Sequence, residues 1–241
     1  MINSTYLAIS AQLALQQRLD TIANNVANVS TAGFRAEQIR FASKPSVHAL
    51  PLSSFAAVGE TYLARGAGEV VRSDNPLDVA VDGDAWLAVA TPQGTGYSRD
   101  GRMQITPSGE LVTLTGHPVL DLGGSTIRLD PAAGPPSIAR DGAITQANRR
   151  VGQIGLFAID PAARLSRGVD ATVTSTVPPQ PAVDQPFVGL RQGFVERSNV
   201  NPVTEMSRLI LDQRMFEAVT GVLSETEQTK QDAIRTLGAA S

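Results

Sequence analysis

The feature that most constrains this chain is an apolar seam near its N-terminus. Leu15, Leu19, Ile22, Val26 and Val29 follow one another at steps of four, three, four and three residues. This spacing places side chains along one face of a helix. The same rhythm continues toward the N-terminus through Ile2, Tyr6, Ile9 and Leu13. A helix over residues 2–29 would be about 40 Å long, and its apolar face needs a surface that covers it. That surface could be the core of its own domain or a second helix.

A second and longer helix is predicted at the other end of the chain. Asn201 suits the N-cap and Pro202 the first helical position, and Glu205 places an acid in the first turn. Alternating steps of three and four then reach Leu237, through Met206, Leu209, Gln213, Phe216, Thr220, Leu223, Glu227, Lys230 and Ile234. A helix of about 50 Å needs a partner along most of its length. We therefore expect the two terminal helices to pair as a coiled coil, because an uncovered stripe forfeits on the order of ten kcal/mol.

The middle of the chain has the pattern of an antiparallel β domain. Short β-type runs cover residues 77–81, 85–90, 102–106, 110–115, 126–129 and 153–159, with turn pairs such as Asp82-Gly83 and Asp141-Gly142 between them. Trp86, the only tryptophan, is expected in the core, and residues 187–195 are expected to add a strand or ribbon. The predicted fold is α+β: a terminal helical domain (1–30 and 199–241), an extended connector (31–74) and an all-β domain with a return segment (75–198).

Composition argues against several classes of chemistry. The absence of cysteine excludes disulfides and thiolate sites. A net charge of -3 with 5% aromatic residues is a poor match to nucleic-acid binding. His48 and His117 are the only histidines, and the nearby carboxylates Asp82 and Asp84 are typical of turns. We therefore expect no catalytic residue, no metal and no cofactor. No run of about 18 apolar residues exists for membrane insertion, and the N-terminus lacks the pattern of a secretory signal.

Five stretches resemble the flagellar basal-body rod and hook family. Residues 19–34 carry Ile-Ala-Asn-Asn-Val-Ala-Asn followed by Thr-Ala-Gly-Phe, which is similar to the N-terminal signature of the family. Asn-Val-Asn-Pro-Val at 199–203 and Gln-Arg-Met-Phe-Glu at 213–217 resemble its terminal helix, and residues 75–83 and 97–101 resemble its middle. Residues 6–12 and the modest length are most similar to the proximal-rod branch. The distal-rod branch is the alternative, although it usually has Tyr where this chain has Phe216.

The resemblance implies a structural subunit of a helical tube. The paired terminal helices would line the inner tube and the β domain would form the outer layer. The tube would transmit torque across the periplasm and pass later subunits. Expected partners are other copies, neighbouring proximal- and distal-rod subunits and the flagellar type III export apparatus, which would move the chain without a cleaved signal peptide. The implied location is the flagellar basal body, with no enzymatic activity, no nucleic acid and no direct membrane insertion.

We expect the assembly interface to lie on both terminal helices. Asn24, Asn25 and Asn28 are predicted to set the register between helices, because a buried amide disfavours any arrangement that leaves it unbonded; the alternative is that they are solvated. The other predicted interface residues are Leu15, Leu19, Ile22, Val26, Val29, Phe34, Met206, Leu209, Gln213, Phe216, Leu223, Ile234 and Leu237. Two competing classes stay open: a wall-acting hydrolase or carbohydrate-binding β protein, and a secreted adhesin.

Overall fold

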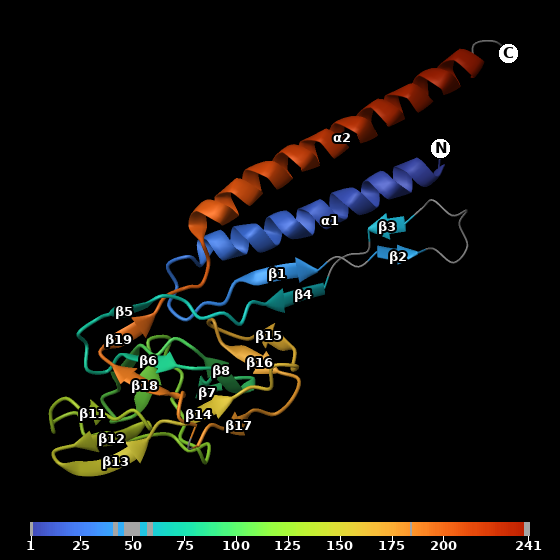
Figure 1. Cartoon of the computed structure of the whole chain (residues 1–241). Coiled ribbons are helices and arrows are strands. Elements are labelled where there is room, and N and C mark those ends of the chain that lie inside the picture. Colours follow the sequence, from blue (N-terminus) through green and yellow to red (C-terminus); the bar gives the residue numbers. More distant parts are fainter. Residues whose placement is uncertain (1, 41–42, 46–53, 57–59, 184, 239–241) are drawn as a thin grey trace. The chain divides into compact units, whose positions relative to one another are not determined.

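The chain divides into two compact units. This computed structural model describes residues 2–40, 43–45, 54–56, 60–183 and 185–238 (Figure 1). Unit 1 comprises residues 1–27, 37–62 and 201–241, and unit 2 comprises residues 28–36 and 63–200. The α+β class is confirmed, because helices and antiparallel strands are both present. Strands β1 to β5 occupy part of the stretch that the sequence suggested as an extended connector.

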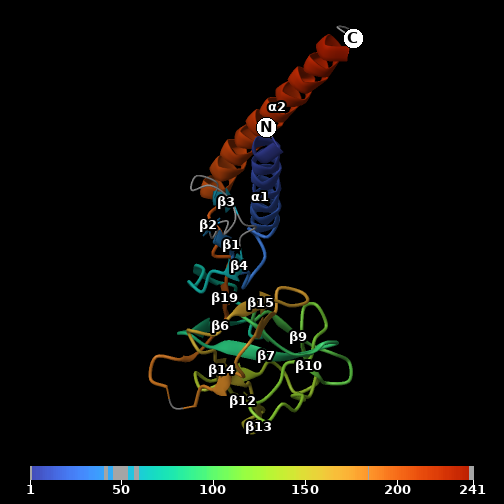
Figure 2. The same ribbon diagram turned by 90° about the vertical axis from the view of Figure 1, so that its right-hand side faces the viewer.

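Unit 1 consists of two helices and two short strand pairs. Helix α1 spans Ile2–Ala27 and helix α2 spans Pro202–Gly238. Figures 1 and 2 show them running in opposite directions, with α2 continuing past the N-terminal end of α1. Strand β1 (Glu37–Arg40) pairs with β4 (Glu60–Leu63), and β2 (Ser43–Pro45) pairs with β3 (Ser54–Ala56). Both β1 and β3 contact α1.

Local chemistry explains where the helices begin and end. Asn201 caps α2, because its Oδ1 accepts a hydrogen bond from Thr204 N at 3.1 Å. Helix α1 ends at Ala27, two residues before the predicted Val29. The carbonyl of Asn28 accepts a hydrogen bond from Thr31 N at 3.1 Å, and its side-chain oxygen accepts one from the Thr31 hydroxyl at 3.1 Å. These two bonds close a turn, and the turn stops the helix.

A coiled coil running along two long terminal helices is not supported. Helix α1 has 26 residues against 37 in α2, so α1 is too short to cover its partner. The predicted seam also does not extend along α1, because Ile9 and Leu13 are 42% and 53% exposed. The residues of α2 that are least exposed recur at 205, 209, 212, 216, 219, 223 and 226. Leu209, Phe216 and Leu223 belong both to this covered face and to the seam predicted from the sequence. At three other positions, Glu205, Asp212 and Val219 are covered. The sequence had predicted Met206, Gln213 and Thr220 there.

Unit 2 is built from antiparallel strands. Its strands are β5 (Val70–Arg72), β6 (Val79–Asp82), β7 (Trp86–Thr91), β8 (Gly94–Ser98), β9 (Met103–Ile105), β10 (Leu111–Thr113), β11 (Ser137–Ile138), β12 (Ala143–Gln146), β13 (Arg149–Gln153), β14 (Leu156–Ala158), β15 (Leu165–Arg167), β16 (Val173–Ser175), β17 (Gln180–Pro181), β18 (Gly189–Gln192) and β19 (Phe194–Glu196). The largest sheet has the order β15-β16-β8-β7-β14-β17, and β11-β12-β13 form a second one. The remaining pairs are β9 with β10, β6 with β18 and β5 with β19.

The return segment closes unit 2 on its own first strands. Residues 187–195, predicted as a strand or ribbon, contain β18 and most of β19, which pair with β6 and β5. The predicted strand at 126–129 is only partly right, since Thr126 and Arg128 make isolated bridges. Trp86 is 1% exposed, which confirms its expected place in the core. Within the described residues, no helix is both long and apolar enough to cross a membrane.

Candidate assembly interface

The buried carboxylate of Glu196 is the centre of a charged cluster in unit 2. Glu196 ends β19 and is fully buried. Its Oε1 accepts hydrogen bonds from Arg35 Nη1 at 2.6 Å and from Gly68 N at 2.9 Å. Its Oε2 accepts hydrogen bonds from Arg99 Nη2 and Nε, each at 2.7 Å. Charge-assisted hydrogen bonds of this kind are about twice as strong as hydrogen bonds between neutral groups. One side chain thus joins three stretches that are far apart in sequence.

The two arginines also donate hydrogen bonds to backbone carbonyls. Arg99 Nη1 donates to Gly83 O at 2.8 Å, Arg99 Nη2 donates to Val81 O at 2.9 Å, and Arg35 Nη1 donates to Gly66 O at 2.8 Å. Both guanidinium groups also lie over the Trp86 ring, at 5.4 and 5.9 Å from its centroid. Burial lowers the pKa of Arg35, although the charge of Glu196 acts in the opposite direction. Removing the carboxylate would therefore leave two buried cations without their counter-ion.

Gly33 and Phe34 fit against the same cluster. Gly33 has a φ of +66°, and its N donates to Glu196 O at 2.8 Å. A Cβ at this position would lie 2.2 Å from Asp100 N, so only glycine fits. Phe34 is buried with Ala36 and Val200. These contacts give a physical reason for the Thr-Ala-Gly-Phe-Arg stretch: each of its last three residues is held by unit 2.

Asn199 ties together the places where the chain enters and leaves unit 2. Its Oδ1 accepts a hydrogen bond from Ala36 N at 2.7 Å, and its Nδ2 donates to Gly66 O at 2.7 Å. We call Arg35, Arg99, Glu196 and Asn199 the clasp. The clasp joins residues 33–36, 66–68 and 196–199, so that both ends of unit 2 are held at one place.

In unit 1 a buried amide links α1, β1 and α2. Asn25 is 2% exposed. Its Oδ1 accepts a hydrogen bond from Glu37 N at 2.9 Å, and its Nδ2 donates to Glu37 O at 2.9 Å. The same Nδ2 donates to Glu205 Oε2 at 3.3 Å, and Arg208 Nη1 donates to Glu205 Oε1 at 2.7 Å. Asn25 therefore bonds both to the first strand of the unit and to the first turn of α2.

A second polar contact lies two turns further along α2. Arg18 Nη2 is 3.0 Å from Asp212 Oδ1, and Asp212 is buried. Its other oxygen, Oδ2, is buried without a hydrogen-bond partner among the described residues. Glu205 and Asp212 are seven residues apart, so they lie on the same face of α2. This face therefore carries carboxylates at positions where an apolar seam was expected, and these specify which α2 surface meets α1.

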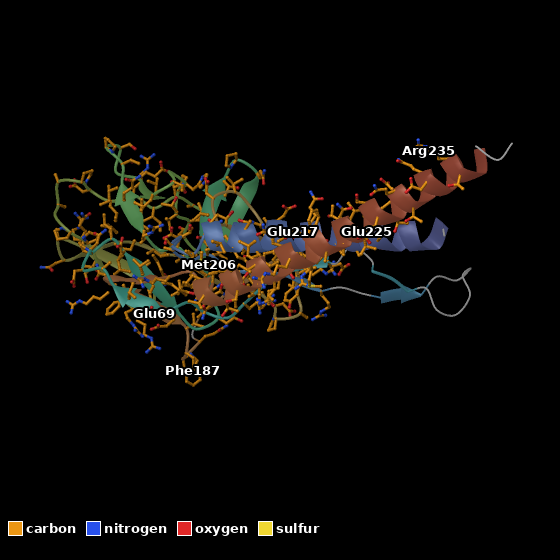
Figure 3. The ribbon with its side chains drawn as sticks, turned by 90° about the horizontal axis from the view of Figure 1, so that it is seen from above. Glu69, Phe187, Met206, Glu217, Glu225 and Arg235 are labelled. Atoms are coloured by element: carbon orange, nitrogen blue, oxygen red, sulfur yellow. The ribbon has the colours of Figure 1, made fainter. Side chains whose placement is uncertain are left out.

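The rest of α2 exposes apolar side chains. Val203, Met206 and Ile210 form one stripe, and Leu211, Met215 and Val222 form another; each of the six is more than half exposed. Figure 3 shows Met206, Glu217 and Glu225 in that order along the helix. Exposed apolar surface of this extent typically marks an interaction site.

The predicted interface residues differ in how exposed their side chains are. Leu15, Ile22, Asn25 and Phe34 are buried; Leu19, Asn24, Val26, Asn28, Val29, Leu209, Phe216 and Leu223 are half-buried; Met206 and Gln213 are exposed. The side chains of Ile234 and Leu237 lie outside the described residues. Phe34 belongs to the core of unit 2, not to a helical seam. Sequence reasoning missed Glu196 and Asp212 as pairing partners, and it gave Glu205 only the role of an acid in the first turn of the helix.

Asp78 and Asp82, two carboxylates of unit 2 that acid–base chemistry could use, make structural contacts. Asp82 accepts two hydrogen bonds from Arg191 Nη2 at 3.0 Å, and Asp78 accepts one from Asn75 Nδ2 at 2.9 Å. Across the described part of the chain, no three His, Cys, Asp or Glu side chains gather as a metal site would require.

Three family models match successive parts of the chain. They are described as "Flagella basal body rod protein" (residues 6–35), "Flagellar hook protein FlgE/F/G D1 domain" (residues 80–146) and "Flagellar basal body rod FlgEFG protein C-terminal" (residues 191–236). Arg35, Arg99 and Glu196 each fall in a different one of these segments. The clasp thus joins the three regions that the family models describe.

Full-length relatives agree with these matches. A protein of Mesorhizobium japonicum is 46% identical over 241 residues, and one of Rhizobium meliloti is 40% identical over 240 residues; both matches cover 100% of each chain. A Bacillus subtilis protein is 30% identical over 261 residues, covering 97% of this chain and 98% of its own. The chain belongs to the flagellar basal-body rod protein family. The Mesorhizobium and Rhizobium relatives are both named "Flagellar basal-body rod protein FlgF", whereas the Bacillus relative is named FlgG.

Proposed function

We propose that the chain is a structural subunit of the proximal part of the flagellar basal-body rod. Its most important support is similarity to FlgF proteins along the whole chain, at 46% and 40% identity. A distal-rod role of the FlgG kind has weaker support, from a relative at 30% identity. The subunit assembles with other copies and with neighbouring rod proteins in the basal body. Its role is mechanical, and it catalyses no reaction.

The exposed apolar stripes of α2 support assembly through the terminal helices. Helix α1 covers the face that carries Glu205 and Asp212, which leaves the stripes around Met206 and Met215 open. Burying a large apolar side chain contributes about 1.5–3 kcal/mol, so neighbouring copies that cover these stripes stabilise a polymer strongly. In the rod, these exposed stripes of α2 form helix–helix seams with neighbouring subunits. The terminal helices line the tube and unit 2 forms its outer layer.

The register of these seams depends on the polar residues of α1. Asn25 already selects one arrangement of α1, β1 and α2 inside the subunit, because any slip breaks its hydrogen bonds to Glu37 and Glu205. Asn24 acts in the same way toward neighbouring helices, and so does Asn28, which directly follows the last residue of α1. The interface residues proposed from the sequence, from Leu15 to Leu237, are retained as the assembly surface, apart from Phe34, which belongs to the core of unit 2.

Export and torque transmission complete the proposal. The chain travels unfolded through the flagellar type III export apparatus, and the absence of cysteine avoids disulfides that would block threading. In the periplasm the rod transmits torque through many subunit contacts, and its lumen passes later subunits.

A matched pair of substitutions on α1 tests this function. Ile22 is buried and Ala23 is exposed, so Ile22→Asp places a carboxylate in the helical contact, whereas Ala23→Asp does not. Each variant is expressed in motile cells that lack the native chain. We expect Ala23→Asp to support swimming and to be recovered in purified basal bodies, and Ile22→Asp to fail in both. Swimming without the native chain and without either variant would contradict a rod function.

A further inference from the structure

The tip of the β12–β13 hairpin has an unusual backbone. Ala147 and Asn148, the two residues between the strands, have φ values of 48° and 60°. Both residues of a tight type I′ turn need this left-handed conformation. Asn tolerates it, but for Ala it costs about 1–2 kcal/mol. The chain therefore keeps a strained, compact turn at this place, which is typical of segments that have a function.

The same hairpin directs cations and an apolar side chain outward. The pairing shifts between Ile144 and Thr145, so Val151 is the extra residue of a β-bulge, a feature that re-aims side chains. Val151 is 40% exposed, and Arg149 and Arg150 are also exposed. Arg150 Nη2 donates to Gln153 Oε1 at 2.9 Å. Neither arginine forms a salt bridge with a described carboxylate. We call Arg149, Arg150 and Val151 the hairpin tip.

Elsewhere on unit 2, a cavity has complementary chemistry. Its volume is about 390 Å³, and its lining includes Asp84, Asp160, Pro161, Val177, Pro178 and Pro181. A water molecule occupies about 30 Å³, so the cavity has room for a side chain. Asp84 and Asp160 are exposed, and neither forms a salt bridge within the described residues. We call it the proline-lined cavity; no residue of the hairpin tip lines it.

We propose that the hairpin tip of one copy docks in the proline-lined cavity of a neighbouring copy. The guanidinium of Arg150 or Arg149 bonds to Asp84 and Asp160, while its aliphatic stem and Val151 pack on the prolines. This inference rests on the proposed function, because it assigns a second contact between rod subunits, on unit 2 instead of the helices. Complementary charge identifies the partner: the chain itself carries both halves of the contact.

The symmetry of this contact suits a polymer. The tip and the cavity are different surfaces of one unit, so each contact leaves a free cavity on one copy and a free tip on the other. Such head-to-tail contacts continue from copy to copy, whereas a contact between identical surfaces stops at a dimer. The proposed contact therefore adds subunits in the same way as the helical seams.

Introduced cysteines test the contact directly, because the native chain has none. One full-length copy carries Arg150→Cys and a second, differently tagged copy carries Val177→Cys. Both are expressed in cells that lack the native chain, and purified basal bodies are oxidised. We expect a disulfide-linked pair that contains both tags. Arg128→Cys, another exposed arginine of unit 2, is the control and should not link to Val177→Cys.

Reversing the charge on each side of the contact is the second test. Adding Arg149→Glu to the Arg150→Cys copy should lower the yield of the linked pair about tenfold, since like charges then face each other. Adding Asp84→Lys to the Val177→Cys copy should restore the yield. Copies that enter basal bodies but give no specific pair overturn the contact and leave the rod function intact. A linked product with a different protein also overturns it. Absence of every copy from basal bodies overturns both proposals.

Discussion

At the scale of single residues, Glu196 links several distant segments of unit 2. Its carboxylate meets two guanidinium groups and a backbone N–H in a site with no exposure to water. Replacing a whole buried ion cluster by apolar residues can be harmless, but removing one partner leaves an uncompensated charge. Here the partner that matters most is the single anion.

We expect Glu196→Gln to destabilise unit 2 by about 3–5 kcal/mol, because Arg35 and Arg99 then stay buried without a counter-ion. Glu69→Gln is the control: Glu69 is exposed, and its 3.7 Å contact with Arg197 is a surface pair that contributes about 1 kcal/mol or less. Urea unfolding followed through the fluorescence of Trp86 measures both changes. Equal shifts for the two variants would show that the cluster adds no more than an ordinary surface pair.

At the scale of elements, α1 and α2 meet through a face that is partly polar. Apolar contact alone would allow α2 to rotate or slide along α1, because its exposed stripes are as apolar as the covered face. The hydrogen bond from Asn25 to Glu205 and the ion pair between Arg18 and Asp212 remove that freedom. The polar contacts therefore select the geometry, while the apolar side chains supply most of the favourable free energy.

Asn25→Ala should loosen the attachment of β1 to α1. The substitution removes the two hydrogen bonds that Asn25 makes with the N–H and C=O of Glu37, and each such bond contributes about 0.5–1.5 kcal/mol. Hydrogen exchange at the Glu37 amide is expected to become faster in this variant. Gln16→Ala, at an exposed position of the same helix, should leave that exchange rate unchanged. An unaltered rate in Asn25→Ala would mean that β1 is held by other contacts.

At the scale of the whole molecule, the clasp holds both ends of unit 2 together without using either terminal helix. All the partners of Glu196 and Asn199 belong to residues 28–36 or 63–200. The strands that close the unit, β18 and β19, also lie in this range. A fragment of residues 28–200 thus contains every contact of its own core.

We therefore expect the fragment 28–200 to fold without α1 and α2. Trp86, the sole tryptophan, should keep the blue-shifted emission of a buried indole. The shorter fragment 28–190 lacks β19 and Glu196, so it should emit as an unfolded chain. Emission typical of solvent-exposed tryptophan from fragment 28–200 would place the source of stability in unit 1 instead.

Sequence reasoning reached the elements more easily than their contacts. Periodicity predicted both helices, and β-type runs with turn pairs predicted most strands of unit 2, because these patterns are local. The covered face of α2 was only half predicted. Alternating steps of three and four select Leu209, Phe216 and Leu223, but they do not distinguish Glu205 from Met206 at the positions between. The choice depends on Asn25, which is 180 residues away from Glu205.

The clasp shows where prediction from the sequence ends and where the tertiary structure is needed. By itself, the sequence determined the family, the α+β class, the N-cap at Asn201 and the core position of Trp86, because each depends on neighbouring residues or on a recognisable stretch. Only the tertiary structure decided that Arg35, Arg99 and Glu196 meet. Their pairing repays the cost of burying charge only when three distant segments fold together, and no local pattern records that convergence.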